Sequence, residues 1–327
     1  MIILPNLNIP RVTLINPSTP HAEQHGRKFV RHFGLVPNEA RAERHNNCHI
    51  GTLAGHTYLQ ADRHRLELIT AWIGCLFALD DLFDETTTGH SPKQVRKICD
   101  RVLAQLPPSV GSTPTPTGEF DEAFKELWRR TSALMSEAWR TRFHLHLANF
   151  FDYCVWEAEN RAISALPPLD EYRSRRADAF LTYADFIEIA NDAELPGEIA
   201  TMKLLRTATL AAGDITLWTN DLFSWARERE NGEVHNYVSL KQQIDDISAQ
   251  EAVDAVGSAI RIRIVEFDEL IRKLRTHFEK ADFDKERGAL ERHLTSLGQW
   301  LPGQLAWRFV SERQKSAWGT MDEGPAQ

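Results

Sequence analysis

The stretch ADRHRLELITAWIGCLFALDDLFDE, residues 61–85, carries the strongest structural pattern in the sequence. A helix with one buried face is indicated by apolar residues that recur every three or four positions, namely Leu66, Ile69, Ile73 and Leu76. The next two positions on that face are Asp80 and Asp84, so the face changes from hydrocarbon to carboxylate at its C-terminal end. Carboxylates there oppose the helix dipole, and burying them without a partner costs several kcal/mol. A bound divalent cation would remove both penalties, whereas the alternative is a solvated helix end.

Composition and charge exclude several classes of protein. The chain has 327 residues, of which 42% are hydrophobic and 26% charged, and its net charge is −8. A negative chain is a poor candidate for binding nucleic acid or anionic membranes. The longest apolar run, residues 71–79, is about half a membrane span. The four cysteines form no CxxC pattern and the N-terminus lacks a basic signal region, so we expect free thiols and a cytoplasmic protein without membrane insertion.

The distribution of helical patterns predicts an all-α fold. Residues 1–20 contain four prolines and no helical period, which predicts an extended N-terminal arm. From residue 21 to 327, helical patterns alternate with short breaks, for example at 194–197 and 301–303, and no strand-like alternation persists. We predict one α-helical domain over 21–327 with about ten helices.

A second motif, NDLFSWARE at residues 220–228, places three oxygen-bearing side chains at intervals of four. Each step of four advances a helix by only about 40°, so Asn220, Ser224 and Glu228 form one slanted file about 12 Å long. An amide, a hydroxyl and a carboxylate suit Mg²⁺, which keeps its remaining positions for water or substrate phosphates. Arg227 could reach the same anion. The alternative is an ordinary polar helix face that ends at Asn231.

Together these motifs resemble those of the bacterial-type class I terpene synthases, or terpene cyclases. DDLFDE matches the aspartate-rich motif of that family and NDLFSWARE its second metal motif, and the separation of 140 residues from Asp80 to Asn220 also fits. The resemblance extends over nearly the whole chain, including PLDEYRSRR at 168–176 and ENGEVHNYVSL at 230–240. It implies an α-helical bundle with an active-site cup at one end.

The resemblance also implies an activity. Such an enzyme ionises and cyclises a linear prenyl diphosphate and releases pyrophosphate. Farnesyl diphosphate is the favoured substrate, which would give a cyclic sesquiterpene or a sesquiterpene alcohol. Three Mg²⁺ ions are implied, held by Asp80 and Asp84 on one side and by Asn220, Ser224 and Glu228 on the other.

Further residues are implied around the diphosphate. Arg175, followed by Asp178 and Ala179, has the spacing of the family's diphosphate-sensing arginine, and Arg176 is the alternative one position on. The sequence departs from the family pattern at two other residues that would contact the diphosphate. Arg227 stands where lysine is more usual, and that exchange keeps the charge but alters the geometry.

The second departure lies near the C-terminus. Arg313 aligns with the arginine of an Arg-Tyr pair, but Gln314 replaces the tyrosine, and a shifted register would make Arg308-Phe309 the pair. Neither register supplies the tyrosine hydroxyl. Aromatic faces would stabilise the carbocation. Phe77 is the first candidate, followed by Trp307 and Trp300, with Phe180 as a further one; for Trp300 and Phe180 plain core packing is the favoured alternative.

The sequence is also compatible with two other functions. A chain-elongating prenyl diphosphate synthase would need a second aspartate-rich motif, which DDISA at 245–249 does not provide. A non-catalytic protein that binds prenyl diphosphates is favoured only by Gln314. A homodimer is compatible with the resemblance, although no residue indicates it.

Overall fold

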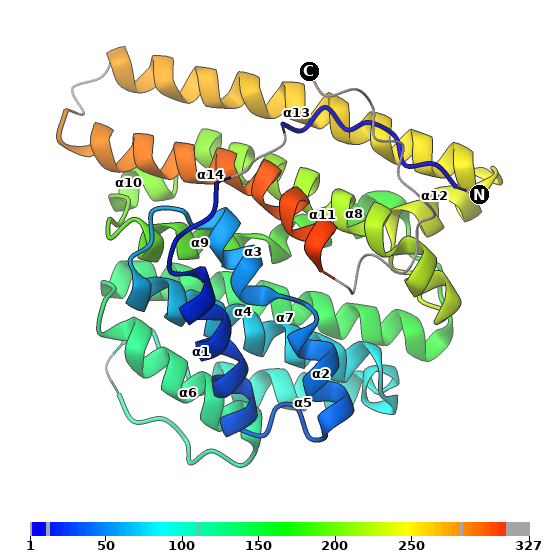
Figure 1. Ribbon diagram of the computed structural model, residues 1–327, viewed down its shortest axis with the longest axis horizontal. Coiled ribbons are helices and arrows are strands. Elements are labelled where there is room, and N and C mark those ends of the chain that lie inside the picture. Colours follow the sequence, from blue (N-terminus) through cyan, green and yellow to red (C-terminus); the bar gives the residue numbers. More distant parts are fainter. Residues whose placement is uncertain (1, 11–13, 110, 281–283, 312–327) are drawn as a thin grey trace.

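The computed structural model describes residues 2–10, 14–109, 111–280 and 284–311 (Figure 1). These residues form fourteen α-helices and one 3₁₀-helix and include no β-strand. The helices are α1 (Thr19–His32), α2 (Glu39–Asn46), α3 (Ile50–Thr57), α4 (Arg63–Asp84), η1 (Thr87–His90), α5 (Pro92–Leu103), α6 (Glu119–Ser132), α7 (Glu137–Ile163), α8 (Leu169–Ala179), α9 (Leu181–Ala190), α10 (Gly197–Ala200), α11 (Lys203–Glu230), α12 (Tyr237–Asp245), α13 (Ala249–Lys280) and α14 (Asp284–Val310). The all-α prediction is confirmed, with more helices than the about ten that the sequence suggested.

Helix α4 lies in the middle of the bundle. The Asp62 side chain caps it by accepting a hydrogen bond from the Arg65 amide at 2.9 Å. The helix packs against α1, α3, α6 and α9, so it is buried on several sides. Trp72 anchors it through ring contacts at 5.2–5.9 Å to α6, α7 and α9, made with Phe124, Phe143 and Phe186. This packing fixes the direction in which the acidic end of α4 projects.

Helix α11 packs against both α13 and α14. Gly213 lets the Phe180 ring approach closely, because a Cβ on this glycine would lie 2.9 Å from the Phe180 side chain. Phe180 itself separates α8 from α9. The break between α8 and α9 is therefore held directly against the helix that carries the second motif.

The N-terminal segment and the cysteines can be compared with their predictions. Residues 2–10 run without helical structure along α13, where the Ile3 amide donates to Gln250 Oε1 at 2.9 Å and Arg261 donates to the Asn6 carbonyl at 3.0 Å (Figure 1). The prediction of free thiols is confirmed, because all four cysteines are buried and unpaired with one another. None of the described helices is long and apolar enough to cross a membrane.

One predicted break is wrong. Residues 301–303 lie inside α14, which continues through Pro302. A Cβ on Gly303 would lie 2.6 Å from the His56 carbonyl oxygen, so this glycine allows α14 to pack closely on α3. The Pro-Gly pair serves a helix contact rather than a turn.

Candidate active site

A cavity opens among α4, α7, α8, α11 and α14, and its lining differs from one part to another. Apolar and aromatic side chains form much of the wall, namely Leu53, Leu76, Phe77, Phe150, Ala179, Phe180, Tyr183, Leu217, Trp300 and Trp307. Charged and amide groups are contributed by Asp80, Asp84, Glu157, Arg161, Arg176, Asn220, Arg227, Glu228, Glu233, His235, Gln304 and Arg308. The cavity therefore joins a charged region to an apolar chamber.

Carboxylates gather where the C-terminal end of α4 meets α7. Asp84 accepts a hydrogen bond at 2.7 Å from Arg161, which also pairs with Glu233 at 2.8 Å and approaches Glu157 at 3.6 Å. Burial raises the pKa of Asp84 well above its usual value, and the neighbouring charge of Asp80 adds to this effect. The carboxylates in this part of the wall outnumber the one arginine that faces them.

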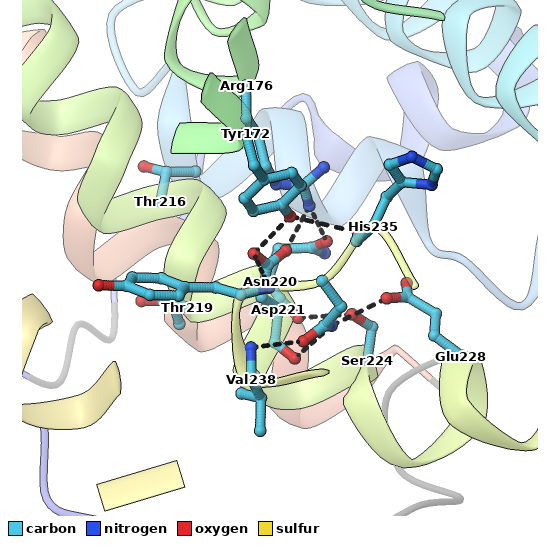
Figure 2. A network of polar contacts seen from close by, with 12 residues as sticks. Tyr172, Arg176, Thr216, Thr219, Asn220, Asp221, Ser224, Glu228, His235 and Val238 are labelled. Atoms are coloured by element: carbon cyan, nitrogen blue, oxygen red, sulfur yellow. Dashed lines mark hydrogen bonds and ion pairs between the residues drawn. The ribbon is translucent and has the colours of Figure 1, made fainter. Parts of the chain in front are cut away.

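The second motif lies on α11 (Figure 2). Asn220 accepts a hydrogen bond from Arg176 at 3.1 Å, and Glu228 accepts one from Asn236 at 2.9 Å. Both residues line the cavity. Ser224 is buried behind this lining, and its hydroxyl donates to the Asn220 carbonyl at 2.8 Å. Two of the three predicted ligands therefore face the cavity directly, and the hydroxyl of the third is occupied within the helix.

The two motifs are joined by a polar chain that the sequence reasoning missed. Arg161 connects Asp84 on α4 to Glu233, which follows Glu228 by five residues. Burial alone would raise the pKa of Glu233, but the hydrogen bond from His235 at 2.5 Å and the charge of Arg161 hold it well below the usual range. Only the proximity of ENGEVH to the second motif could have indicated these residues; nothing in the α7 sequence distinguishes Arg161.

The oxygen donors fit a hard divalent cation. Carboxylate and amide oxygens are the ligands that Mg²⁺ prefers, and a cation would offset both the burial and the repulsion from Asp80 that raise the pKa of Asp84. Within the described part of the chain, no three His, Cys, Asp or Glu side chains are gathered closely enough to hold an ion by themselves. Any metal bound here would therefore take further oxygens from water or from a ligand.

The predicted arginine sensor requires a correction. The Arg175 side chain is 43% exposed, pairs with Glu171 at 2.8 Å and does not line the cavity. Arg176 does line it, and its guanidinium pairs with Asp221 at 2.5 Å. Burial opposes the charge of Arg176, but Asp221 raises its pKa well above the usual value. Neighbouring residues on a helix point about 100° apart, so only one of the two can face the cavity.

Of the remaining predicted site residues, some line the cavity and others do not. Ala179 and Arg227 line the cavity, whereas Asp178 does not and pairs with Arg206 at 2.8 Å. Arg313 and Gln314 lie outside the described residues.

The aromatic candidates all lie in the cavity wall. The rings of Phe77 and Trp307 meet edge to face at 6.2 Å, and those of Phe180 and Trp300 at 5.1 Å. Phe180 and Trp300 are thus both core residues and part of the lining.

Comparison with known proteins identifies similar chains. Residues 71–266 match the family model described as terpene synthase family 2, C-terminal metal binding. The chain is 30% identical over 305 residues to (+)-T-muurolol synthase of Roseiflexus castenholzii, whose name specifies cyclisation of (2E,6E)-farnesyl diphosphate; the match covers 91% of this chain and 90% of that relative. It is 28% identical over 292 residues to 10-epi-cubebol synthase of Sorangium cellulosum, covering 88% and 90%. The fold is similar to that of germacradien-4-ol synthase from Streptomyces citricolor, with a TM-score of 0.81, 26% identity and coverage of 94% and 99%.

Proposed function

The chain belongs to the terpene synthase family, as an enzyme of the bacterial class I type, and from this premise we propose that it ionises and cyclises farnesyl diphosphate in a Mg²⁺-dependent reaction. The observation that carries this proposal is that the oxygen-rich ends of α4 and α11 and a set of aromatic side chains line the same cavity. The charged region suits a diphosphate and the chamber suits a hydrocarbon chain. The name of the Roseiflexus castenholzii relative, which specifies farnesyl diphosphate, supports the C15 substrate.

Three Mg²⁺ ions are proposed at the charged region. Their ligands would be Asp80 and Asp84 from α4 and Asn220, Ser224 and Glu228 from α11. Bound there, the ions would supply positive charge that stabilises the leaving diphosphate.

The arginines of the cavity would hold the same leaving group. Arg176 and Arg227 present fixed guanidinium groups at the charged region, where donors set in advance act on charge as it develops. Cleavage of the carbon–oxygen bond leaves its electron pair on the diphosphate and an allylic cation in the chamber. Arg313, outside the described residues, stays a predicted third contact.

The aromatic walls would protect the cation. The faces and edges of Phe77 and Trp307 offer no nucleophile, and each ring contributes about 0.5–2 kcal/mol of cation–π attraction. The apolar side chains of the lining would also disfavour water in the chamber. Ring closure can then precede loss of a proton or capture of water.

Product analysis tests this proposal. Purified protein is incubated with geranyl, farnesyl or geranylgeranyl diphosphate, with and without Mg²⁺, and volatiles are analysed by gas chromatography–mass spectrometry while released pyrophosphate is measured. We expect a Mg²⁺-dependent cyclic sesquiterpene or its alcohol from farnesyl diphosphate. Longer prenyl diphosphates on addition of isopentenyl diphosphate would instead show a chain-elongating enzyme. Binding of diphosphate with no turnover of any substrate would show a non-catalytic binder.

A further inference from the structure

Two neutral polar side chains, Thr216 on α11 and Gln304 on α14, line the cavity next to its apolar wall. Gln304 lies four residues after Trp300 and three before Trp307, and both of these rings line the cavity. Thr216 precedes the predicted ligand Asn220 by about one helical turn (Figure 2). Thr216 is 5% exposed and Gln304 is 1% exposed. Polar groups buried in this way are costly unless they have hydrogen-bond partners.

The hydroxyl of Thr216 differs from those of the other threonines on α11. The hydroxyls of Thr207, Thr209 and Thr219 each donate to the backbone carbonyl four residues earlier, at 2.6–3.0 Å. The Thr216 hydroxyl is buried and has no partner among the described residues. A hydroxyl left in this way loses the hydrogen bonds that it makes in water. Because Thr216 lines the cavity, a molecule inside the cavity can supply the missing partner.

Gln304 is connected to Thr216 through the guanidinium of Arg308. Arg308 Nε donates to Gln304 Oε1 at 2.7 Å, and a terminal nitrogen of the same group donates to the Thr216 carbonyl at 3.4 Å. The amide nitrogen of Gln304 donates to the Leu301 carbonyl at 3.1 Å, and a side-chain amide has a second hydrogen, for which the described residues provide no partner. Two neutral side chains from the packed helices α11 and α14 therefore each retain unused hydrogen-bonding capacity in the cavity wall.

We propose that Thr216 and Gln304 hold a water molecule in the chamber and that this water captures the carbocation, so that the product is a cyclic sesquiterpene alcohol. This inference rests on the proposed function, because that function generates the cation. A buried water needs about two to four polar partners, and the hydroxyl and the amide provide two of them. The aromatic side chains on either side of Gln304 would keep other waters away from the cation.

The capture step needs no other reactant. A lone pair of the water oxygen forms a new bond to the cationic carbon, which gives a protonated alcohol. This alcohol then loses one proton to the pyrophosphate that ionisation has released into the same cavity. One helical turn rises about 5.4 Å, so a water at Thr216 would lie close to the region of Asn220 and the pyrophosphate.

Product analysis in ¹⁸O-labelled water tests this inference. Farnesyl diphosphate is incubated with the protein and Mg²⁺, and the ratio of cyclic alcohol to cyclic hydrocarbon is measured by gas chromatography–mass spectrometry while released pyrophosphate is counted. We expect wild type to form a cyclic alcohol that contains ¹⁸O. Thr216→Val keeps the shape of the side chain and should lower the ratio about 3- to 10-fold, the usual effect of one neutral hydrogen bond. Thr216→Ser keeps the hydroxyl and should retain the ratio.

Thr219→Val is the matched control on the same helix. The Thr219 hydroxyl donates to the Ile215 carbonyl at 2.6 Å, and Thr219 does not line the cavity. This variant should keep the wild-type ratio of alcohol to hydrocarbon. Gln304→Met guards against misfolding of Thr216→Val and should lower the ratio in the same direction.

The outcomes separate this inference from the proposed function. Pyrophosphate release without a ¹⁸O-labelled cyclic alcohol in the wild type would overturn water capture alone. An unchanged ratio in Thr216→Val, or in Gln304→Met if Thr216→Val misfolds, would overturn the assigned water site. An equal loss of alcohol in Thr219→Val would overturn it too. Failure of the wild type to release pyrophosphate from farnesyl diphosphate would overturn the proposed function, and this inference with it.

Discussion

At the scale of single residues, Asp80 is the carboxylate on which the metal assignment most depends. Asp80→Asn keeps the size of the side chain and removes its charge. We predict that pyrophosphate release from farnesyl diphosphate falls about 100- to 1,000-fold, the range for removing one fixed electrostatic contact at a reacting centre. The measurement is a steady-state pyrophosphate assay over a Mg²⁺ titration.

The matched control for Asp80 is Asp170→Asn. The Asp170 side chain is 99% exposed at the start of α8, and its one ion pair is long, at 4.0 Å. This variant should keep wild-type activity. Full activity of Asp80→Asn with normal Mg²⁺ dependence would show that Asp80 is not a metal ligand.

Arg175 and Arg176 form a natural pair for comparison. Arg176→Lys should lower kcat about 100-fold, because lysine lacks the planar fork by which one terminal nitrogen donates to Asp221 and Asn220 while the other donates to Tyr153. Arg175→Lys should change kcat less than twofold, since its pair with Glu171 is exposed and contributes at most about 1 kcal/mol. Activity assays and circular dichroism of both variants check this. A larger loss in Arg175→Lys would return the sensing role to Arg175.

The same pair shows what the sequence could predict about the site. Spacing from the second motif narrowed the sensor to two neighbours, and the acidic and Asn-Ser-Glu motifs located the parts of the charged wall that α4 and α11 contribute. Which arginine faces inward depends on how α8 rotates against α7 and α11, and one sequence does not reveal that rotation. Arg161 escaped prediction for a related reason, because its partners Asp84 and Glu233 are 77 and 72 residues away.

At the scale of helices, the contact of α11 with the α8–α9 junction shapes the chamber. Gly213→Ala would place a Cβ 2.9 Å from Phe180 and force this ring to move. Overpacking of this kind costs about 1–3 kcal/mol, and a displaced Phe180 would change the cavity wall. We predict a lower Tm and an altered product distribution, measured by calorimetry and gas chromatography–mass spectrometry.

Gly298→Ala is the control for this helix contact. Apart from the backbone of α14 itself, no atom of the described residues lies within 4 Å of a Cβ added at Gly298, so the variant should gain about 0.5–1 kcal/mol of stability. Its products should be unchanged. Equal behaviour of the two alanine variants would contradict the close packing inferred at Gly213.

The position of a helix could be predicted where apolar residues recur along one buried face. It could not be predicted where a contact with a distant helix overrides the local preference for a turn. The stripe from Leu66 to Leu76 led directly to α4, whose bounds fall within two residues of the quoted stretch. The Pro-Gly pair at 302–303 suggested a turn, but α14 continues because Gly303 admits the backbone of α3. Local composition contains no information about that distant contact.

At the scale of the whole molecule, His293 links stability to pH. It is 5% exposed in α14, and burial lowers its pKa from 6.5 to about 4, with the charge of Arg142 adding to this effect. Between pH 6.5 and 4 the unfolded chain binds a proton at this residue and the folded protein does not. The contribution is therefore complete above pH 6.5 and is lost as the pH falls towards 4.

The pH effect is measured as a difference between two proteins. Burial raises the pKa of Glu188 to about 7 and that of Asp221 to about 6, so these carboxyls favour folding as the pH falls and would obscure His293 in the wild type alone. From pH 7 to 5, wild type should lose about 2 kcal/mol more unfolding free energy than His293→Gln. Urea unfolding at both pH values provides the comparison, and parallel losses would contradict it.

In the proposed function, the charged ends of α4 and α11 hold divalent ions around a diphosphate in one cavity. The most direct test is anomalous X-ray diffraction from crystals grown with Mn²⁺ and pyrophosphate. We predict Mn²⁺ peaks coordinated by Asp80 or Asp84 on one side and by Asn220, Ser224 and Glu228 on the other, with pyrophosphate between them. Pyrophosphate bound in the cavity without ions at these side chains, or Mn²⁺ bound only elsewhere, would contradict it.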